Sequence, residues 1–267
     1  MIIGGKEFKN RTYIMGILNV TPDSFSDGGR FDSIDKALKH TEHMITEGAD
    51  LIDVGGESTR PGHIQISEEQ EIERVMPVIE KIKAEFDIPV SVDTYKSSVA
   101  LEAIKAGADL LNDIWGFKYD IKMAALAAEY KLPCCLMHNR RVPVYEDFIN
   151  DVISDLKESV DIAKTAGVTD DKIILDPGVG FGKTYEQNLE ITNKTELLHT
   201  LGYPLLLAAS RKSMIGNTLN LPTEERLEGT LATSVLAVLK NCLFVRVHDI
   251  KENKRIITMT EKIIGRY

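Results

Sequence analysis

The segment Gly48–Asp53, GADLID, recurs 59 residues later as Gly107–Asn112, GADLLN. In each copy a glycine precedes a short apolar run, which is typical of a helix that ends at a glycine cap and is followed by a strand. The spacing of 59 residues matches the length of two strand-plus-helix units. The repeat therefore predicts a regular alternation of strands and helices.

Eight short apolar runs recur along the chain at intervals of about one strand plus one helix. Most are continuous rather than alternating, as expected for parallel strands whose two faces are covered by helices and by a barrel core. We predict strands at residues 13–18, 51–54, 89–92, 110–111, 133–137, 173–175, 204–209 and 243–247.

Eight strand-plus-helix units favour a single (β/α)₈ TIM barrel over residues 1–267. The length of 267 residues is close to that of such barrels, which is about 250. A doubly wound open sheet is the alternative, because it also alternates strands and helices. The number of units and the lack of a glycine-rich phosphate-binding fingerprint after the first strand favour the barrel.

One of the intervening segments carries clear helix signals. Ser67 and Gln70 form a capping box before apolar residues at helical spacing, which continue to Phe86. Pro77 lies inside this pattern and predicts a kink or a helix boundary near it.

Composition limits the partners of the chain. The formal net charge is -9 and no stretch is rich in Lys and Arg, so we expect no nucleic-acid partner. No apolar run reaches the roughly 18 residues of a membrane span, and the start of the sequence lacks the apolar core of a signal peptide. We therefore expect a cytoplasmic protein without membrane contact. The three cysteines, Cys134, Cys135 and Cys242, fit reduced core residues better than a disulfide frame.

Polar residues stand where the predicted strands stop. In a closed barrel the C-terminal strand ends meet around one mouth, so residues far apart in sequence become neighbours, and this predicts an enzyme. The residues at these stops are Asn19, Gly55 with Glu57, Asp93, Asn112, His138, Asp176, Arg211 with Lys212, and Arg246 with His248.

Several of these residue types suit specific chemistry. The Asn19 carboxamide oxygen can join a hard cation such as Mg²⁺, whose other ligands are phosphate oxygens and water. Arg246 and His248 alternate around Val247, so both side chains can face one side of a strand and bind phosphate. The structural alternatives are helix or loop capping for Asp93 and Asp176, and a surface charge or packed histidine for the last pair. For Asp53 we expect a structural hydrogen-bonding role.

Two long motifs identify a family. Gly16–Gly29, GILNVTPDSFSDGG, and Asp53–Gly62, DVGGESTRPG, closely resemble the two signature segments of the dihydropteroate synthases, which act in folate synthesis. Shorter matches follow in the family's order: SVDT at 91–94, ND at 112–113, LMH at 136–138, DPGVGFGK at 176–183, SRKS at 210–213 and RVHD at 246–249.

The resemblance implies a homodimeric TIM barrel with a defined reaction. The family joins 6-hydroxymethyl-7,8-dihydropterin diphosphate to p-aminobenzoate and releases pyrophosphate, with Mg²⁺ present. By this resemblance the pterin diphosphate would contact Thr59, Asp93, Asn112, Asp176, Lys212, Arg246 and His248. The p-aminobenzoate would contact Phe25, Arg60, Pro61, Phe181 and Ser213. Asn19 would be the metal ligand, and Asp93, Lys212 and Arg60 the catalytic residues.

Other functional interpretations stay open at this point. A pterin-binding methyltransferase module shares the barrel and the pterin-facing Asp and Asn, but does not need a diphosphate clamp and both long loops. A catalytically silent paralogue would bind pterins without condensing them, which the presence of Arg60, Asp93, Lys212 and His248 disfavours.

Two further motif matches are poor. Residues 177–184 resemble a P-loop, but Pro177 replaces its first glycine. His138 with Cys134 and Cys135 has no common zinc spacing, so we expect His138 to pack or to support the site from behind.

The segment 230–239, TLATSVLAVL, is apolar around most of a helix circumference. One buried face does not explain this pattern, and a homodimer interface does.

Overall fold

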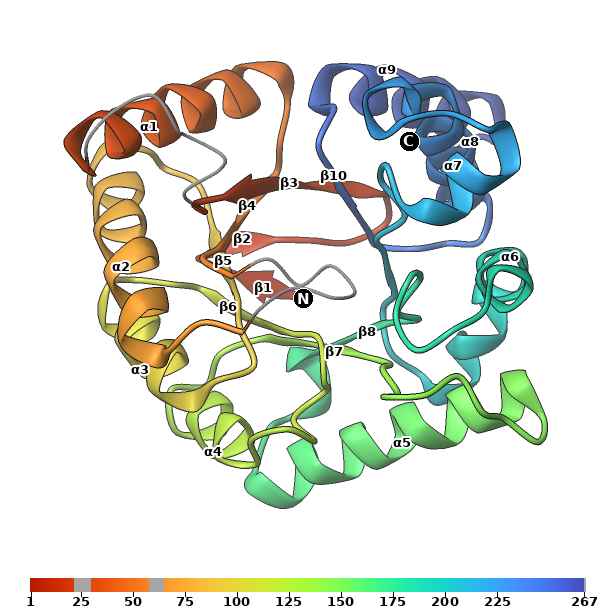
Figure 1. The fold of residues 1–267 in the computed structure, drawn as a ribbon, viewed down its shortest axis with the longest axis horizontal. Coiled ribbons are helices and arrows are strands. Elements are labelled where there is room, and N and C mark those ends of the chain that lie inside the picture. Colours follow the sequence, from red (N-terminus) through yellow and green to blue (C-terminus); the bar gives the residue numbers. More distant parts are fainter. Residues whose placement is uncertain (22–29, 58–64, 267) are drawn as a thin grey trace.

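Eight parallel strands form a ring around the centre of the molecule, and helices cover its outside (Figure 1). The computed structural model describes residues 1–21, 30–57 and 65–266. The strands, in spatial order, are β8 (Ile173–Asp176), β7 (Cys134–Met137), β6 (Leu110–Asp113), β5 (Val90–Asp93), β4 (Leu51–Gly55), β3 (Tyr13–Asn19), β10 (Phe244–Val247) and β9 (Leu206–Leu207). A parallel bridge between Leu175 and Leu205 closes the ring between β8 and β9. The predicted TIM barrel is confirmed, and each predicted run overlaps one of these strands.

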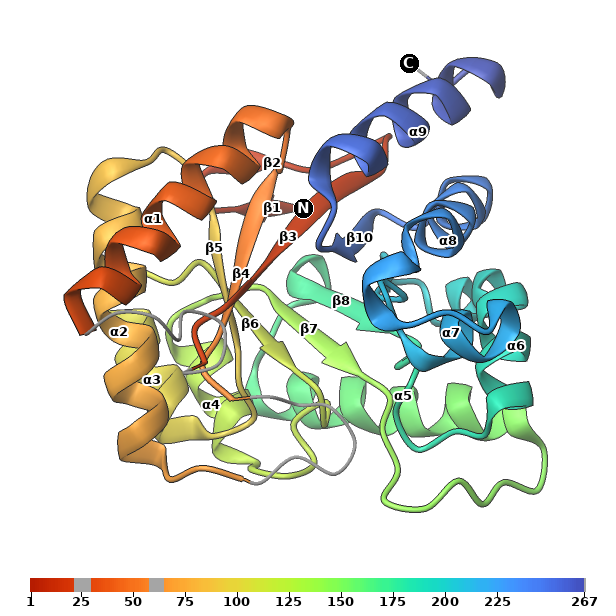
Figure 2. The same ribbon diagram turned by 45° about the horizontal axis from the view of Figure 1, so that its top comes forward.

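The outer layer consists of helices that follow the strands in sequence (Figures 1 and 2). They are α1 (Arg30–Glu47), α2 (Glu68–Glu85), α3 (Ser97–Lys105), α4 (Lys122–Glu129), α5 (Phe148–Ala166), α6 (Tyr185–Asn193), α7 (Ser213–Leu219), α8 (Leu227–Leu239) and α9 (Ile250–Ile263). Short 3₁₀ helices are η2 (Asp170–Lys172), η3 (Thr195–Leu201) and η4 (Thr223–Glu225). Within the described residues, no helix is both long and apolar enough to cross a membrane.

Helix α2 shows how packing overrides a local breaker. The Ser67–Gln70 capping box is present, as predicted. The helix continues through Pro77 to Glu85, so the structure has no helix boundary at the proline. Pro77 removes one backbone hydrogen bond, but the buried face that includes Val75 and Ile79 holds both halves of the helix against the barrel.

The strands alternate between an outer and an inner face. Residues such as Cys134 and Leu136 pack under the helices, whereas Cys135 belongs to a separate inner cluster. The hairpin β1 (Ile2–Ile3) and β2 (Lys6–Glu7), which we did not predict, contributes to that inner cluster. Phe8 beside it stacks edge-on against Tyr13 at 4.8 Å between ring centroids. The hairpin lies within the outline of the strand ring in Figure 1 and packs on the N-terminal half of the barrel core.

The sequence repeat has a structural cause. Gly48 and Gly107 both have φ of +104° and end a helix in the left-handed region. The aspartate that follows each glycine accepts a backbone N–H at the start of a neighbouring strand, at 2.8 Å for Asp50 with Ile14 and 2.8 Å for Asp109 with Val90. The repeat therefore fixes two helix-to-strand junctions in the same way.

Candidate active site

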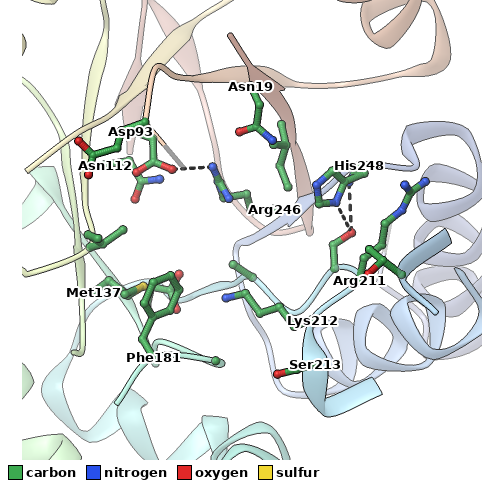
Figure 3. A pocket seen from close by; sticks show the side chains of 18 of the residues that line it. Asn19, Asp93, Asn112, Met137, Phe181, Arg211, Lys212, Ser213, Arg246 and His248 are labelled. Atoms are coloured by element: carbon green, nitrogen blue, oxygen red, sulfur yellow. Dashed lines mark hydrogen bonds and ion pairs between the residues drawn. The ribbon is translucent and has the colours of Figure 1, made fainter. Parts of the chain in front are cut away.

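A pocket of about 460 Å³ lies at the C-terminal mouth of the barrel (Figure 3). All nine predicted site residues that the structure describes line it: Asn19, Asp93, Asn112, Asp176, Phe181, Lys212, Ser213, Arg246 and His248. The other four, Phe25, Thr59, Arg60 and Pro61, lie outside the described residues. Inner-face residues of β3, β5, β6, β8 and β10 meet here because parallel strands end on one rim.

One flank of the pocket is built for a flat polar ring. Asp176 ends β8, and its Oδ1 accepts the N–H of Gly178 at 2.7 Å. Burial raises the pKa of the Asp176 carboxyl, and the nearby Lys212 charge opposes this rise. Asn112 is the residue before the last one of β6, and its Nδ2 donates to Asp53 Oδ2 at 3.1 Å. A carboxylate, an amide and an ammonium thus face one region that can pair with donors and acceptors on a heterocycle.

Lys212 is aimed by a tight turn between β9 and α7. Arg211, just before it, has φ of +56°. The Arg211 guanidinium donates to both carboxylate oxygens of Asp249, with Nε at 3.0 Å from Oδ2. Arg226 donates to the Arg211 carbonyl oxygen at 3.0 Å. These contacts stabilise a backbone conformation that costs a non-glycine residue about 1 kcal/mol or more. The turn directs Lys212 Nζ to the carbonyl oxygen of Val179. The same nitrogen lies 4.8 Å from the centroid of the Phe181 ring.

Burial lowers the pKa of Lys212 to about 8, while the charge of Asp176 opposes this shift. The ammonium form therefore prevails at neutral pH, although less strongly than for an exposed lysine.

Arg246 lies between two carboxylates at the base of the pocket. Its Nε donates to Asp53 Oδ2 at 2.6 Å, and its Nη2 donates to Asp93 Oδ2 at 2.7 Å (Figure 3). Asp53 is fully buried and accepts from both Arg246 and Asn112, so its predicted structural hydrogen-bonding role is confirmed. Burial raises the pKa of Asp93 to about 7 against the opposing charge of Arg246.

The second oxygen of each carboxylate is buried as well. Asp53 Oδ1 and Asp93 Oδ1 have no hydrogen-bond partner among the residues that the structure describes. Asp93 lines the pocket, and its Oδ1 accepts no hydrogen bond from the described residues.

Asn19 and His248 line the opposite flank, with Arg246 between them and the acidic residues (Figure 3). Ser210 holds the His248 ring: its Oγ lies 2.9 Å from Nδ1 and accepts the His248 backbone N–H at 3.2 Å. Asn19 and His248 thus lie on one side of Arg246, and Asp93 lies on its other side.

An apolar wall was not expected from the sequence. Met137 and Ile114 pack with Tyr95, Trp115 and Phe181 in a small separate cluster, and Met137 and Ile114 also line the pocket. The available signal was the period of two in strand 134–137, which puts Cys135 and Met137 on the inner face. Other pocket residues without a predicted role are Ile17, Thr21, Glu57, Gly180, Ala208, Ser210, Arg211, Thr223 and Arg226.

His138 lies behind the pocket. Its Nε2 is 3.0 Å from Asp155 Oδ2, and its Nδ1 is 2.7 Å from Lys183 Nζ. These contacts agree with the expectation that His138 packs or supports the site from behind. Across the described part of the chain, no group of three or more His, Cys, Asp or Glu side chains is arranged to hold a metal ion.

Comparisons with known proteins agree with this geometry. Residues 15–248 match the family model described as pterin binding enzyme. The dihydropteroate synthase of Clostridium beijerinckii is 63% identical, with 100% of each chain covered. A dihydropteroate synthase structure from Clostridium difficile, obtained in the presence of pteroic acid, has a TM-score of 0.95 and 49% identity over 98% of this chain and 100% of that one.

A Xanthomonas albilineans dihydropteroate synthase structure with 4-aminobenzoic acid has a TM-score of 0.92 and 38% identity over 96% of this chain and 94% of that one. Fold, pocket and sequence similarity therefore agree over the whole length. The chain belongs to the pterin binding enzyme family and, within it, to the dihydropteroate synthases.

Proposed function

We propose that this chain condenses 6-hydroxymethyl-7,8-dihydropterin diphosphate with p-aminobenzoate to give 7,8-dihydropteroate and pyrophosphate. One observation carries the proposal: strand-end residues from across the sequence line one pocket, with ring-binding groups on one flank and phosphate-binding groups on the other. The relatives crystallised with pteroic acid and with 4-aminobenzoic acid support the two substrate classes.

The pterin ring binds to the acidic flank. The Asp176 carboxylate accepts hydrogen bonds from the amino-pyrimidinone edge, and Asn112 pairs beside it. Lys212 turns from the Val179 carbonyl to the carbonyl and nitrogen acceptors of the ring. Met137 and Ile114 supply an apolar face for the flat ring, because both line the pocket beside Asn112.

Catalysis depends on stabilising the positive charge that develops on the exocyclic methylene carbon. The C–O bond to the diphosphate breaks and its electron pair leaves with pyrophosphate, so positive charge builds up on the carbon. The Asp93 carboxylate is positioned to stabilise this charge more in the transition state than in the ground state. The amine of p-aminobenzoate then forms the new C–N bond and loses a proton. A dissociative displacement fits this arrangement.

The diphosphate binds to the cationic flank. His248, held by Ser210, and Arg246 supply donors to the phosphate oxygens. Arg246 must share or exchange its contacts with Asp53 and Asp93 when the diphosphate arrives. Binding of the anion therefore changes the charge balance around Asp93.

Mg²⁺ fits this flank if the substrate supplies most of its ligands. The pocket offers one neutral oxygen at Asn19, and Mg²⁺ characteristically combines few protein oxygens with phosphate oxygens and water. When bound, the ion would neutralise charge that develops on the leaving diphosphate.

The p-aminobenzoate site lies at the outer part of the pocket. Phe181 supplies an aromatic face, and Ser213 is exposed at the first turn of α7, where its hydroxyl can donate to the substrate carboxylate. Phe25, Arg60 and Pro61 complete this subsite in our proposal, by resemblance to the family.

Assay of purified protein with both substrates and Mg²⁺ tests the proposed reaction through the formation of dihydropteroate. We expect Asp176→Asn to weaken pterin binding and Arg246→Ala to weaken capture of the diphosphate, each by about tenfold or more. Pterin binding without any dihydropteroate would instead support a silent paralogue. Normal turnover in both variants would show that the residue roles are wrong.

We further propose that the protein is a cytoplasmic homodimer. Exposed apolar side chains occur on α7, α8 and α9, which lie together in Figure 1. They are Leu219, Leu239, Met259, Ile263 and Ile264. The three cysteines are free and buried, as is common in a reducing compartment.

A further inference from the structure

Lys183 lies near the end of the loop between β8 and α6, and its side chain binds the backbone of that loop. This loop carries Gly180 and Phe181, which line the pocket, and it begins directly after Asp176. Lys183 Nζ donates to the carbonyl oxygens of Gly178 at 2.9 Å and Phe181 at 3.0 Å. Its third contact is His138 Nδ1 at 2.7 Å. In its ammonium form Lys183 has three N–H donors, so each has one acceptor here. Burial lowers the pKa of Lys183 to about 7.

These contacts define the protonation state of His138. Because Lys183 donates to Nδ1, the ring proton resides on Nε2 and is donated to Asp155 Oδ2 at 3.0 Å. Burial lowers the pKa of His138 to about 4, which agrees with a neutral ring at neutral pH. His138 is thus an acceptor toward the loop and a donor toward α5.

Asp155 connects this pair to a rigid element. It lies in α5 and binds Arg140 through two contacts, Nε at 2.6 Å and Nη2 at 3.1 Å. The Arg140 guanidinium lies 4.3 Å from the centroid of the Tyr145 ring, and the Tyr145 hydroxyl donates to the Gly182 carbonyl at 2.6 Å. The loop is therefore held from one side by a continuous chain of polar contacts.

Neither Lys183 nor His138 lines the pocket, so neither meets the substrates directly. Lys183 belongs to the segment 177–184 that resembles a P-loop, but its ammonium binds backbone carbonyls of its own loop. The same loop contributes the Val179 carbonyl that contacts Lys212. A shift of this backbone would displace Phe181 and change the environment of Lys212 together.

We propose that Lys183 and His138 are positioning residues that hold the 177–182 loop, and with it the Phe181 ring, in the orientation required by the aromatic amine substrate. The inference rests on the proposed function for the identity of that substrate. Without the Lys183–His138 contact, the loop would be free to shift away from the pocket.

Two substitutions at one position separate the two sides of His138. His138→Asn keeps an oxygen near the position of Nδ1 and can still accept from Lys183. His138→Gln places its amide near the position of Nε2 and keeps only the contact with Asp155. We expect His138→Gln to raise KM for p-aminobenzoate about tenfold, and His138→Asn to stay within about threefold of wild type. Equal KM values in the two variants would overturn the proposal.

Lys183→Met removes all three contacts and should raise the same KM by at least as much. Lys83→Met is the control, because Lys83 is a partly buried lysine that binds Asp109 at 2.8 Å beside the N-terminal end of β6, away from the pocket. A purely structural role of Lys183 would reduce Tm and the active fraction of Lys183→Met without changing its KM. A folded Lys183→Met protein with wild-type KM would therefore contradict the inference.

Hydrogen exchange gives a readout that needs no turnover. Backbone amides of residues 178–182 should exchange faster in Lys183→Met and His138→Gln than in wild type and Lys83→Met. If the wild type forms no dihydropteroate, the proposed function fails, and this exchange pattern still decides whether Lys183 holds the loop. Unchanged exchange in Lys183→Met would overturn the inference.

Discussion

The Arg246 guanidinium is the centre of a buried charge cluster in the pocket floor. Asp53 and Asp93 both accept from it, and Asp53 also accepts from Asn112. A buried ion pair contributes little net stability compared with an apolar core, but removal of one partner leaves an uncompensated charge. The cluster therefore makes the geometry of the floor sensitive to each of its members.

Asp53→Ala should reduce the free energy of unfolding by about 3 kcal/mol, because Arg246 and Asn112 both lose an acceptor inside the barrel. Urea denaturation measures the change. Glu102→Ala is the control: it breaks an ion pair with Lys105 in which both side chains are exposed, and should leave the denaturation midpoint unchanged. Equal effects of both substitutions would show that the buried cluster contributes no more to stability than an exposed ion pair.

The pH dependence of kcat/KM should be bell-shaped. Asp93 must be anionic to stabilise the developing cation, and its pKa is raised to about 7, so activity rises as pH increases through 7. Lys212 must be cationic to donate to the ring, and its pKa is lowered to about 8, so activity falls as pH increases through 8.

Lys212→Arg should move the alkaline limb of this profile to higher pH, because a guanidinium stays charged well above pH 8. A profile measured on wild type and variant checks this. An alkaline limb that stays in place in the variant would exclude Lys212 as its origin.

At the scale of elements, the loops that follow the strands depend on close backbone approach. Gly178, just after β8, has φ of +70°, and a Cβ at this position would lie 1.9 Å from the carbonyl oxygen of His138. This contact lets the β8 loop lie directly on the segment after β7. It also brings Gly178 O within reach of Lys183.

Gly178→Ala should be strongly destabilising, because it adds a backbone clash to an unfavourable φ. Gly202→Ala separates these effects: Gly202 has φ of +84°, but nothing lies within 4 Å of its Cβ position. Its cost should be only the conformational one, about 1 kcal/mol. Thermal denaturation of the two variants measures the difference, and similar Tm values would contradict the clash.

At the scale of the whole molecule, the proposed dimer should depend on the surface of α8 and α9. The Leu239 side chain is 51% exposed and that of Ile263 is 71% exposed. Introduction of charge there should oppose association, since apolar area drives it. We expect Leu239→Glu with Ile263→Glu to sediment as a monomer at micromolar concentration, with wild type as a dimer.

Ile121→Glu is the matched control for this experiment. Ile121 is 70% exposed at the start of α4, which lies on the other side of the barrel from α8 in Figure 1. This variant should keep the mass of the wild type. A monomeric wild type, or equal masses for the double variant and wild type, would reject the proposed interface.

The amino-acid sequence by itself determined the number and order of the eight barrel strands, because apolar runs, caps and helical spacing are local signals. It also placed polar residues at the strand ends, and the closure of a parallel barrel brings such ends together. Only the tertiary structure decided how these side chains pair. Arg246 meets Asp53 and Asp93 across 193 and 153 residues, and Lys183 points to its own loop rather than to a phosphate. Burial and side-chain direction set these pairings, and both depend on packing between distant segments that no local pattern encodes.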